Sequence, residues 1–375
     1  MKTKPSVLSS LIRDTLHHLE QRGLKRTLSL PEGIDFASND ALGLATHPRL
    51  IEKSQEYGSM YGVGSGSSRL VSGNSLLFET IEKKIATFKG KEAALLFNSG
   101  FQANSAVLQS ILGLPSLHPP SVFVDRLVHA SLVQGCRSAG VVPRPFRHND
   151  LNHLEDCLKQ AQGPRFIITE SVFSMDGDRC DLEGLITLKK RYEAFLYIDE
   201  AHATGVYGPK GRGLACHRDV DIVMGTFSKA MGSFGAYVAC DTSLKEFLIT
   251  SCIGFIYTTA LPPSVLGAIE GALDLVPTLE EERNLLFERS QSLRSFIQNR
   301  GGNIGKSTTH IIPLIIGDTT QTMTISEHLK SQGFHIPAIR PPTVSKDTSR
   351  LRISLKSVHT KNQMQRLYDA LGDIL

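Results

Sequence analysis

Apolar residues in the middle of the chain form short runs that alternate with segments of helical spacing. The runs predict buried strands at residues 93–98, 121–125, 166–170, 195–199, 222–226 and 236–240. Helices are predicted after the first two runs, at residues 102–112 and 131–138. Strands that alternate with helices in this way are typical of a mostly parallel sheet covered on both faces. The sequence therefore predicts an α/β fold.

The pattern changes on both sides of this region. An amphipathic helix with a loop is expected at residues 6–30, and a long charged helix at residues 279–300, after Pro262 and Pro263. A strand, a helix, a strand and a last helix are then predicted at residues 311–316, 323–332, 351–355 and 361–371. This order predicts a short N-terminal helical arm (1–44), a large domain (45–260) and a small C-terminal α+β domain (261–375). We expect a site in the cleft between the two domains.

The composition narrows the possible functions. Of the 375 residues, 41% are hydrophobic and 21% are charged, as in an ordinary soluble globular protein. The formal net charge of +4 is mild, and without a concentrated basic stripe we expect no nucleic-acid partner. No apolar run could span a bilayer and the N-terminus lacks the apolar core of a signal peptide, so we expect no membrane association and a cytoplasmic location. The cysteines lack metal-finger spacing, and no metal site is expected.

Two short motifs raise the alternative of a nucleotide-driven motor. Asp199-Glu200-Ala201-His202 follows an apolar run, as in the metal-binding strand of some helicases, and Gly305-Lys306-Ser307 resembles part of a phosphate-binding loop. That loop requires a glycine five positions before Gly305, where this chain has Arg300. The order is also reversed, because the lysine loop should precede the acidic strand. We interpret residues 301–305 as a turn after a helix.

Lys229 is the first candidate for chemistry. It follows a predicted buried strand, within the string Thr226-Phe227-Ser228-Lys229-Ala230-Met231-Gly232. A lysine that forms a Schiff base must lie on rigid backbone and be shielded enough to lose its proton. A lone lysine is usually a solvated surface residue, so its partners in the sequence must decide between the two interpretations.

Those partners follow other predicted strands of the same sheet. Asp199 ends one strand, where a carboxylate can pair with a protonated pyridine nitrogen, and His202 lies three residues on. Where another strand meets a helix, at residues 99–104, free amides can bind phosphate; Gly100 allows close approach, and Thr226 can add a hydroxyl. The order of phosphate site, aspartate and lysine along one sheet predicts a site for pyridoxal 5′-phosphate (PLP).

These segments belong to a wider set of motifs. The set comprises residues 36–40, 42–44, 64–74, 98–101, 129–131, 170–178, 199–205, 226–229, 257–263 and 339–344. Through these motifs, from about Phe36 to the last helix, the chain resembles the α-oxoamine synthases. These are PLP enzymes of fold-type I, which have an aminotransferase-like large domain with a mostly parallel seven-stranded sheet. Phe227 and Ser345 depart from the usual pattern, but neither change removes a functional group.

The resemblance implies how the cofactor would be held. Lys229 would carry it as a Schiff base and act as the base, Asp199 would pair with the ring nitrogen, and His129 would stack on the ring; these three are the expected catalytic residues. Further contacts are implied from His202 and Ser174 near the ring hydroxyl, and from Thr226, the amides of Gly100 and Phe101, and Thr259 of a neighbouring subunit at the phosphate.

The resemblance also implies the substrates. Asn39 and Arg352 would hold the amino-acid carboxylate, and Arg340 would face the acyl chain or its terminal carboxylate, since an arginine fork can bind both carboxylate oxygens. Before Phe36 the match is poor, and Arg26 receives no firm role. The implied reaction is the decarboxylative condensation of L-alanine with pimeloyl-CoA or a pimeloyl-acyl-carrier protein in biotin synthesis, by a homodimer with shared active sites.

Two further interpretations stay open within the same fold. Another α-oxoamine synthase would use glycine or serine with a different acyl-CoA; the string at residues 339–344, with its arginine and paired prolines, favours alanine. A catalytically inactive regulatory subunit would lack the Schiff-base lysine, and the presence of Lys229 argues against it.

Overall fold

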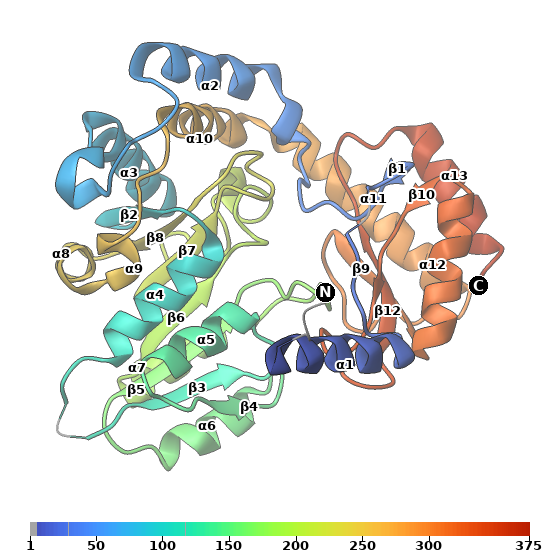
Figure 1. Ribbon diagram of the computed structural model, residues 1–375, viewed down its shortest axis with the longest axis horizontal. Helices are drawn as coiled ribbons and strands as arrows, with labels where there is room; N and C mark the ends of the chain where they lie inside the picture. The colour runs from blue at the N-terminus through green and yellow to red at the C-terminus, as the bar shows by residue number, and fades with distance from the viewer. Residues whose placement is uncertain (1–5, 29, 117) are drawn as a thin grey trace.

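The computed structural model describes residues 6–28, 30–116 and 118–375, so the first five residues of the predicted arm and its residue 29 lie outside the described part. The elements form a larger and a smaller group, which lie side by side (Figure 1). The helix α11 (Glu280–Asn299) leads from the larger group into the smaller one.

The larger group is built on a seven-stranded sheet with the order β2-β8-β7-β6-β5-β3-β4. β8 is antiparallel to both of its neighbours, and the other pairs are parallel. The strands are β2 (Ala93–Phe97), β3 (Ser121–Asp125), β4 (Arg144–Phe146), β5 (Arg165–Glu170), β6 (Phe195–Asp199), β7 (Ile222–Thr226) and β8 (Ala236–Cys240). The predicted fold class, with its mostly parallel sheet, is confirmed.

Helices cover both faces of this sheet. α4 (Gly100–Leu112), α5 (Ala130–Ser138), α8 (Thr242–Ser251) and α9 (Ile253–Ile256) share one apolar core with one face of the strands. On the other face lie α2 (Pro48–Tyr61), α3 (Leu76–Lys89), α6 (Leu151–Lys159), α7 (Leu182–Tyr192) and α10 (Pro263–Leu275). Strand residues alternate between the two cores, as Val124 and Phe123 do, because successive side chains point to opposite faces.

Several of these helices begin at an aspartate. The side chains of Asp150, Asp181 and Asp241 accept hydrogen bonds from the backbone N–H three residues on, and so cap α6, α7 and α8. Short 3₁₀ helices lie at Leu44–Thr46, Pro209–Gly211 and Val276–Thr278, and a short π-helix lies at Arg69–Gly73.

The smaller group is an antiparallel three-stranded sheet packed against helices. The sheet has the order β11-β12-β9, with β9 (Ile311–Gly317), β11 (Ala338–Ile339) and β12 (Ser349–Ser354). Beside it lie α11, α12 (Thr319–Ser331) and α13 (Lys361–Gly372), and β10 (Phe334–His335) pairs in parallel with β1 (Ile34–Asp35) from the start of the chain. The predicted small α+β unit is present.

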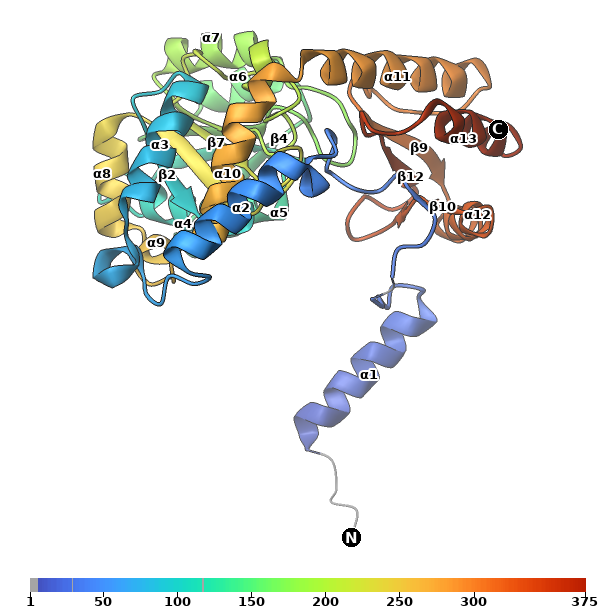
Figure 2. The same ribbon diagram turned by 90° about the horizontal axis from the view of Figure 1, so that it is seen from above.

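The first helix projects from the rest of the molecule. α1 (Val7–Gln21) has no buried residue, and Figure 2 shows it pointing away from both groups. Its apolar residues are therefore exposed; Val7, Leu8 and Leu11 retain 80%, 66% and 58% of their accessible surface. In the part of the chain that the structure covers, no helix has the length and apolar character needed to cross a membrane.

The predicted boundary between the large and the small domain, after residue 260, has no sharp counterpart in the packing of the helices. α10 follows that position, yet it packs on α2 and α3 of the larger group. The division stays a prediction. The segment of the motor alternative, Gly305-Lys306-Ser307, is a turn between α11 and β9, as the interpretation of a turn after a helix requires.

Candidate active site

The candidate site is a cavity of about 220 Å³ where β5, β6 and β7 end. Parallel strands present their carboxyl ends at one edge of a sheet, and ligands of open α/β sheets bind outside that edge. Among the predicted residues, those that line the cavity are Gly100, Phe101, His129, Ser174, Asp199, His202, Thr226 and Lys229. The fold therefore brings together most of the site that the sequence predicted.

Lys229 lies just after β7, and its Nζ is 2.8 Å from Nε2 of His202. Burial lowers the pKa of Lys229 to about 8, against the opposing charges of Asp199 and Glu170. Burial, followed by the charge of Lys229, also lowers the pKa of His202 well below its usual value. The imidazole is therefore neutral, and the lysine amine is easily freed of its proton, as a nucleophile or a base must be.

This low pKa predicts how cofactor capture by the cofactor-free protein depends on pH. The neutral amine is the nucleophile, so the capture rate should rise with pH and level off above about pH 8, where Lys229 is mostly uncharged. Stopped-flow absorbance after mixing with PLP measures the rate. Nα-acetyl-lysine amide, whose single free amine has a pKa near 10.4, serves as the control. A rate that still climbs through pH 10 would identify an ordinary solvated lysine.

Asp199 is held by donors on two sides. Its Oδ1 accepts the N–H of Ala201 at 2.8 Å, and its Oδ2 accepts the side-chain amide of Asn104 at 2.7 Å. Asp199 is 4% exposed and lines the same cavity as Lys229, where the ring nitrogen of a pyridine could meet its carboxylate.

His129 and Glu170 form the next wall. His129 is the N-cap of α5, and its backbone N–H donates to the Glu170 carboxylate at 2.5 Å. Burial, and then the neighbouring charge of Asp199, raises the pKa of Glu170 well above its usual value. Burial also lowers the pKa of His129, which favours a neutral ring that can stack on a flat ligand.

The phosphate end of the site is the start of α4. Ser99 caps this helix by accepting the N–H of Gln102 at 3.2 Å. The N–H groups of Gly100 and Phe101 have no acceptor among the described residues, and such groups at a helix N-terminus bind phosphate. A Cβ on Gly100 would point toward Thr226 and occupy this space.

The hydroxyl of Thr226 is already engaged. It donates to the carbonyl of Gly235 at 2.8 Å and lies 2.7 Å from Oγ of Ser228. Because Thr226 has one hydroxyl hydrogen, Ser228 must be the donor in their contact, and its hydroxyl, which also lines the cavity, would have to turn away from Thr226 to bind a ligand. With an amine, an aromatic face, a carboxylate and a phosphate cradle in one cavity, the residues fit PLP.

Arg352 borders the cavity from the smaller group. Its guanidinium donates to Ser174 O at 2.6 Å, to Ser354 Oγ at 2.7 Å and to Asn39 Oδ1 at 2.9 Å. It is 4% exposed and forms no ion pair with any described carboxylate. Burial lowers its pKa to about 10, which leaves it charged. A buried cation without an anion is an unfavourable arrangement that a carboxylate ligand would relieve.

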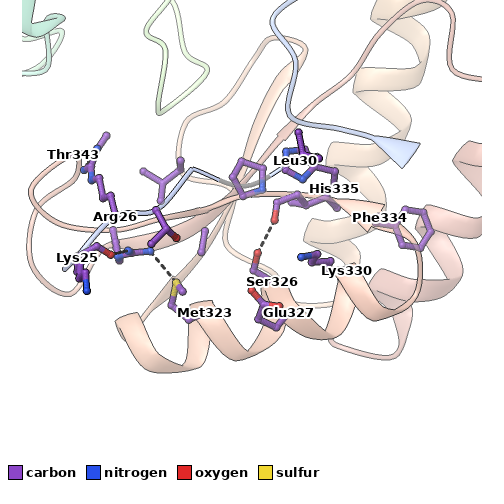
Figure 3. A pocket seen from close by; sticks show the side chains of 16 residues that line it. Lys25, Arg26, Leu30, Met323, Ser326, Glu327, Lys330, Phe334, His335 and Thr343 are labelled. Carbon is purple, nitrogen blue, oxygen red and sulfur yellow. Dashed lines mark hydrogen bonds between the residues drawn. The ribbon is translucent and has the colours of Figure 1, made fainter. Parts of the chain in front are cut away.

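Four predicted residues are not part of the lining of this cavity. Arg352 meets the lining through the carbonyl of Ser174, and Asn39 meets Arg352. The other two are Thr259 and Arg340. Thr259 is exposed, and its carbonyl accepts a hydrogen bond from Asn98 at 2.9 Å. Arg340 lies in a second cavity, of about 470 Å³, between the loop after α1 and the segment from α12 to β11 (Figure 3).

The second cavity is rich in cationic side chains. Its lining includes Lys25, Arg26 and Lys330, which Figure 3 labels, against a single acidic residue, Glu327. Arg340 is the fourth cationic side chain of the lining. The side chain of Arg26 donates to Thr343 at 3.0 Å, and that of Arg340 donates to the Lys25 carbonyl at 3.3 Å. The fold therefore unites Arg340 with Arg26, which the sequence left without a role.

Sequence reasoning missed several residues of the first cavity. Glu170 had the same signal as Asp199, an acidic residue at the end of an apolar strand. Asn104 and Ser131 lie in the motifs at residues 99–104 and 129–131, but neither was assigned a role. Each is a polar residue on the buried side of a predicted helix, and this position could have marked them as site residues. Glu200, which the motor alternative used, is instead buried in an ion pair with Lys89.

Comparisons with known proteins identify the family of this chain. Residues 31–371 match the family described as aminotransferase class I and II. The 8-amino-7-oxononanoate synthase of Gluconacetobacter diazotrophicus is 49% identical, over 96% of this chain and 95% of that protein. The crystal structure of 8-amino-7-oxononanoate synthase from Francisella tularensis has a TM-score of 0.79 at 27% identity, covering 91% of this chain and 97% of that one.

A structure of serine palmitoyltransferase from S. paucimobilis with bound PLP is also similar. It has a TM-score of 0.89 at 25% identity, and 98% of each chain is covered. PLP is the cofactor of this family of acyltransferases, and the expectation drawn from the sequence motifs is confirmed. The chain belongs to the aminotransferase class I and II family and, within it, to the 8-amino-7-oxononanoate synthase branch of the α-oxoamine synthases.

Proposed function

We propose that the protein condenses L-alanine with a pimeloyl thioester and releases 8-amino-7-oxononanoate, CO₂ and the carrier thiol, a step of biotin synthesis. The observation that carries this proposal is the position of Arg352, a buried cation without a counter-ion among the described residues. It donates to the carbonyl of Ser174, which lines the cavity that contains Lys229. An amino acid bound there would place its carboxylate on the arginine and its Cα beside the lysine amine. The printed names of the relatives support the choice of substrates.

The chain's own residues then have separate tasks. Lys229, with its pKa near 8, takes the proton from Cα of the amino acid and later returns one. Asp199 holds a proton at the ring nitrogen of the cofactor, and PLP, when bound, withdraws electrons from Cα so that this carbon can lose its proton. Arg352 turns the carboxylate so that the Cα–H bond stands perpendicular to the ring, and His129 covers the ring face.

The second cavity would take the far end of the acyl chain. A pimeloyl group carries a terminal carboxylate, and Arg26 and Arg340 line this cavity without an acidic partner among the described residues. β11, which leads to Arg340, pairs with β12, the strand that carries Arg352. Arg340 and Arg352 thus belong to neighbouring segments of one sheet, and we propose that one substrate molecule reaches both.

This assignment predicts a selective effect of Arg340→Ala. Loss of a charge-assisted hydrogen bond should raise the KM for pimeloyl-CoA by roughly ten- to a hundredfold and leave the Kd for alanine unchanged. Heptanoyl-CoA, which lacks the terminal carboxylate, is the control substrate. Its KM should be the same in the variant and in the wild type. Equal losses with both thioesters would show that Arg340 binds another part of the molecule.

A second copy of the chain would complete the site. Thr259 is exposed and is not part of the lining of its own chain's cavity, so it is free for the implied contact to a partner's phosphate group. We propose a homodimer on this basis. Sedimentation of the cofactor-loaded protein tests it, since a fully active monomer would refute shared active sites.

The experiment that tests the function is a substrate panel. Purified protein with PLP is mixed with L-alanine, glycine or L-serine and with pimeloyl-CoA or a pimeloyl-carrier protein, and thiol release is measured. Alanine should release thiol fastest. A preference for glycine or serine would move the enzyme to another branch of the α-oxoamine synthases, and the comparison of the two thioesters would identify the carrier.

A further inference from the structure

One buried amide connects the residues that face opposite parts of the cofactor cavity. The side chain of Asn104, which is 1% exposed, donates to Asp199 Oδ2 at 2.7 Å and to Ser131 Oγ at 2.9 Å. Its own oxygen accepts the hydroxyl of Tyr197 at 2.8 Å. The amide therefore has partners on all sides and a single possible orientation, because the Tyr197 hydroxyl must donate to its oxygen once both N–H groups are used.

The network continues from Ser131 to the aromatic wall of the site. Ser131 Oγ lies 2.7 Å from Nδ1 of His129. Asn104 is thus one bond from the carboxylate that would meet the ring nitrogen and two bonds from the imidazole that would cover the ring. Buried polar networks with every member satisfied define one geometry, since any rotation leaves a group unpaired at high cost.

The position of Asn104 on α4 adds a third connection. This helix begins with Gly100 and Phe101, whose free N–H groups form the phosphate cradle, and Asn104 lies about one helical turn later. Residues spaced by three or four lie on the same helix face. A single rigid helix therefore carries the phosphate cradle at its end and the clamp on Asp199 one turn farther on.

We propose that Asn104 is a positioning residue, which sets Asp199 and His129 in register with the phosphate cradle and so makes the cavity select a flat phosphorylated pyridine in one pose. This inference rests on the roles proposed for Asp199 and His129. Asn104 also lines the cavity, but its hydrogen bonds go to these neighbours, and its role is to hold the Asp199 carboxylate in the orientation that meets the ring nitrogen.

The test uses Asn104→Ala, which removes the network, and Asn104→Asp, which keeps the size but removes both donors. Two quantities are measured: the Kd of PLP for the cofactor-free protein, and the pH midpoint of the bound cofactor's absorbance. We expect Kd to rise roughly ten- to a hundredfold in both variants, as for lost hydrogen bonds to a charged group. In Asn104→Ala the midpoint should move upward, because a ring nitrogen with less positive charge lets the nitrogen contributed by Lys229 keep its proton to higher pH. In Asn104→Asp an ionised second carboxylate beside Asp199 favours a positive ring nitrogen and should move the midpoint downward.

Two further variants separate positioning from general loss of packing. Val107→Ala removes a fully buried side chain of the same helix outside the network, and it should lower the melting temperature without changing Kd or the midpoint. Ser131→Ala breaks only the branch to His129, so it should weaken PLP binding without moving the midpoint. Should Asn104→Ala fail to fold, the isosteric Asn104→Asp provides the same two measurements.

Asp199→Asn distinguishes failure of this inference from failure of the proposed roles. A midpoint that moves in Asp199→Asn but stays at the wild-type value in both Asn104 variants would overturn the role of Asn104 alone. If the midpoint is unchanged in Asp199→Asn as well, Asp199 does not contact the ring nitrogen. The proposed role of Asp199 and the inference about Asn104 would then both be wrong. Wild-type Kd and midpoint in a folded Asn104→Asp protein would also reject the proposal.

Discussion

Lys229→Ala is expected to abolish covalent capture of PLP and to lower turnover by more than roughly 10⁴-fold. The base contribution alone is typically about 10²–10⁴-fold, and the variant also loses the amine that anchors the cofactor. No other lysine lines the cavity, so within the described residues nothing can replace it. Borohydride reduction followed by mass spectrometry measures the anchor, and thiol release with alanine and pimeloyl-CoA measures turnover.

The control for this variant is Lys190→Ala, which removes a surface lysine that is 64% exposed and paired with Asp219. It should leave capture and turnover at wild-type levels. A small amine such as methylamine should partly restore turnover in Lys229→Ala by supplying the missing base. Reductive labelling of a different lysine in the variant would contradict the assignment of Lys229.

Arg352→Ala is expected to weaken alanine binding by about 2–5 kcal/mol, or roughly 30- to several-thousand-fold. Arg352 is buried away from water, so its unpaired charge would form a strong ion pair with a bound carboxylate. The alanine variant loses this ion pair. The spectrum of bound PLP should not change, because the arginine contacts Ser174, Ser354 and Asn39 and not the cofactor cradle. Titration of alanine against this spectrum measures the Kd.

Truncation of a buried arginine can also destabilise the fold, and Arg350 offers a matched control. It lies two residues earlier on β12, is 5% exposed, and pairs with Asp176 at 2.7 Å. Arg350→Ala should lose comparable stability in thermal unfolding while keeping a near-normal Kd for alanine. Arg352→Lys should recover only part of the affinity, since an ammonium cannot bind both oxygens in one plane. An unchanged Kd in Arg352→Ala would exclude this residue from the substrate site.

The strands that carry the chemistry could be predicted because their signal is local. Residues 195–199 and 222–226 are short apolar runs buried on both faces, and the structure has strands with these same bounds. Each run ends in a polar residue that lies at the carboxyl edge of the sheet, which is why Asp199 and Thr226 were placed in the site. The edge strand β4 was missed, because Arg144 and Pro145 interrupt its apolar character and two of its three residues are exposed.

The partners of these residues were decided by the tertiary structure. Asn104 and Asp199 are far apart in sequence, and only the packing of α4 against the sheet brings the amide within 2.7 Å of the carboxylate. The pairing of Arg26 with Arg340 in one cavity likewise depends on where the loop after α1 runs beside β11, and no local pattern specifies such a path. By itself, the sequence determined the fold class and the order of the chemical groups, and it singled out Lys229 as the proposed Schiff-base lysine, since these depend on local periodicity and motif. The folded chain decided which polar groups meet, because hydrogen bonds and burial in a site depend on distances between elements that the spacing of residues along the chain does not contain.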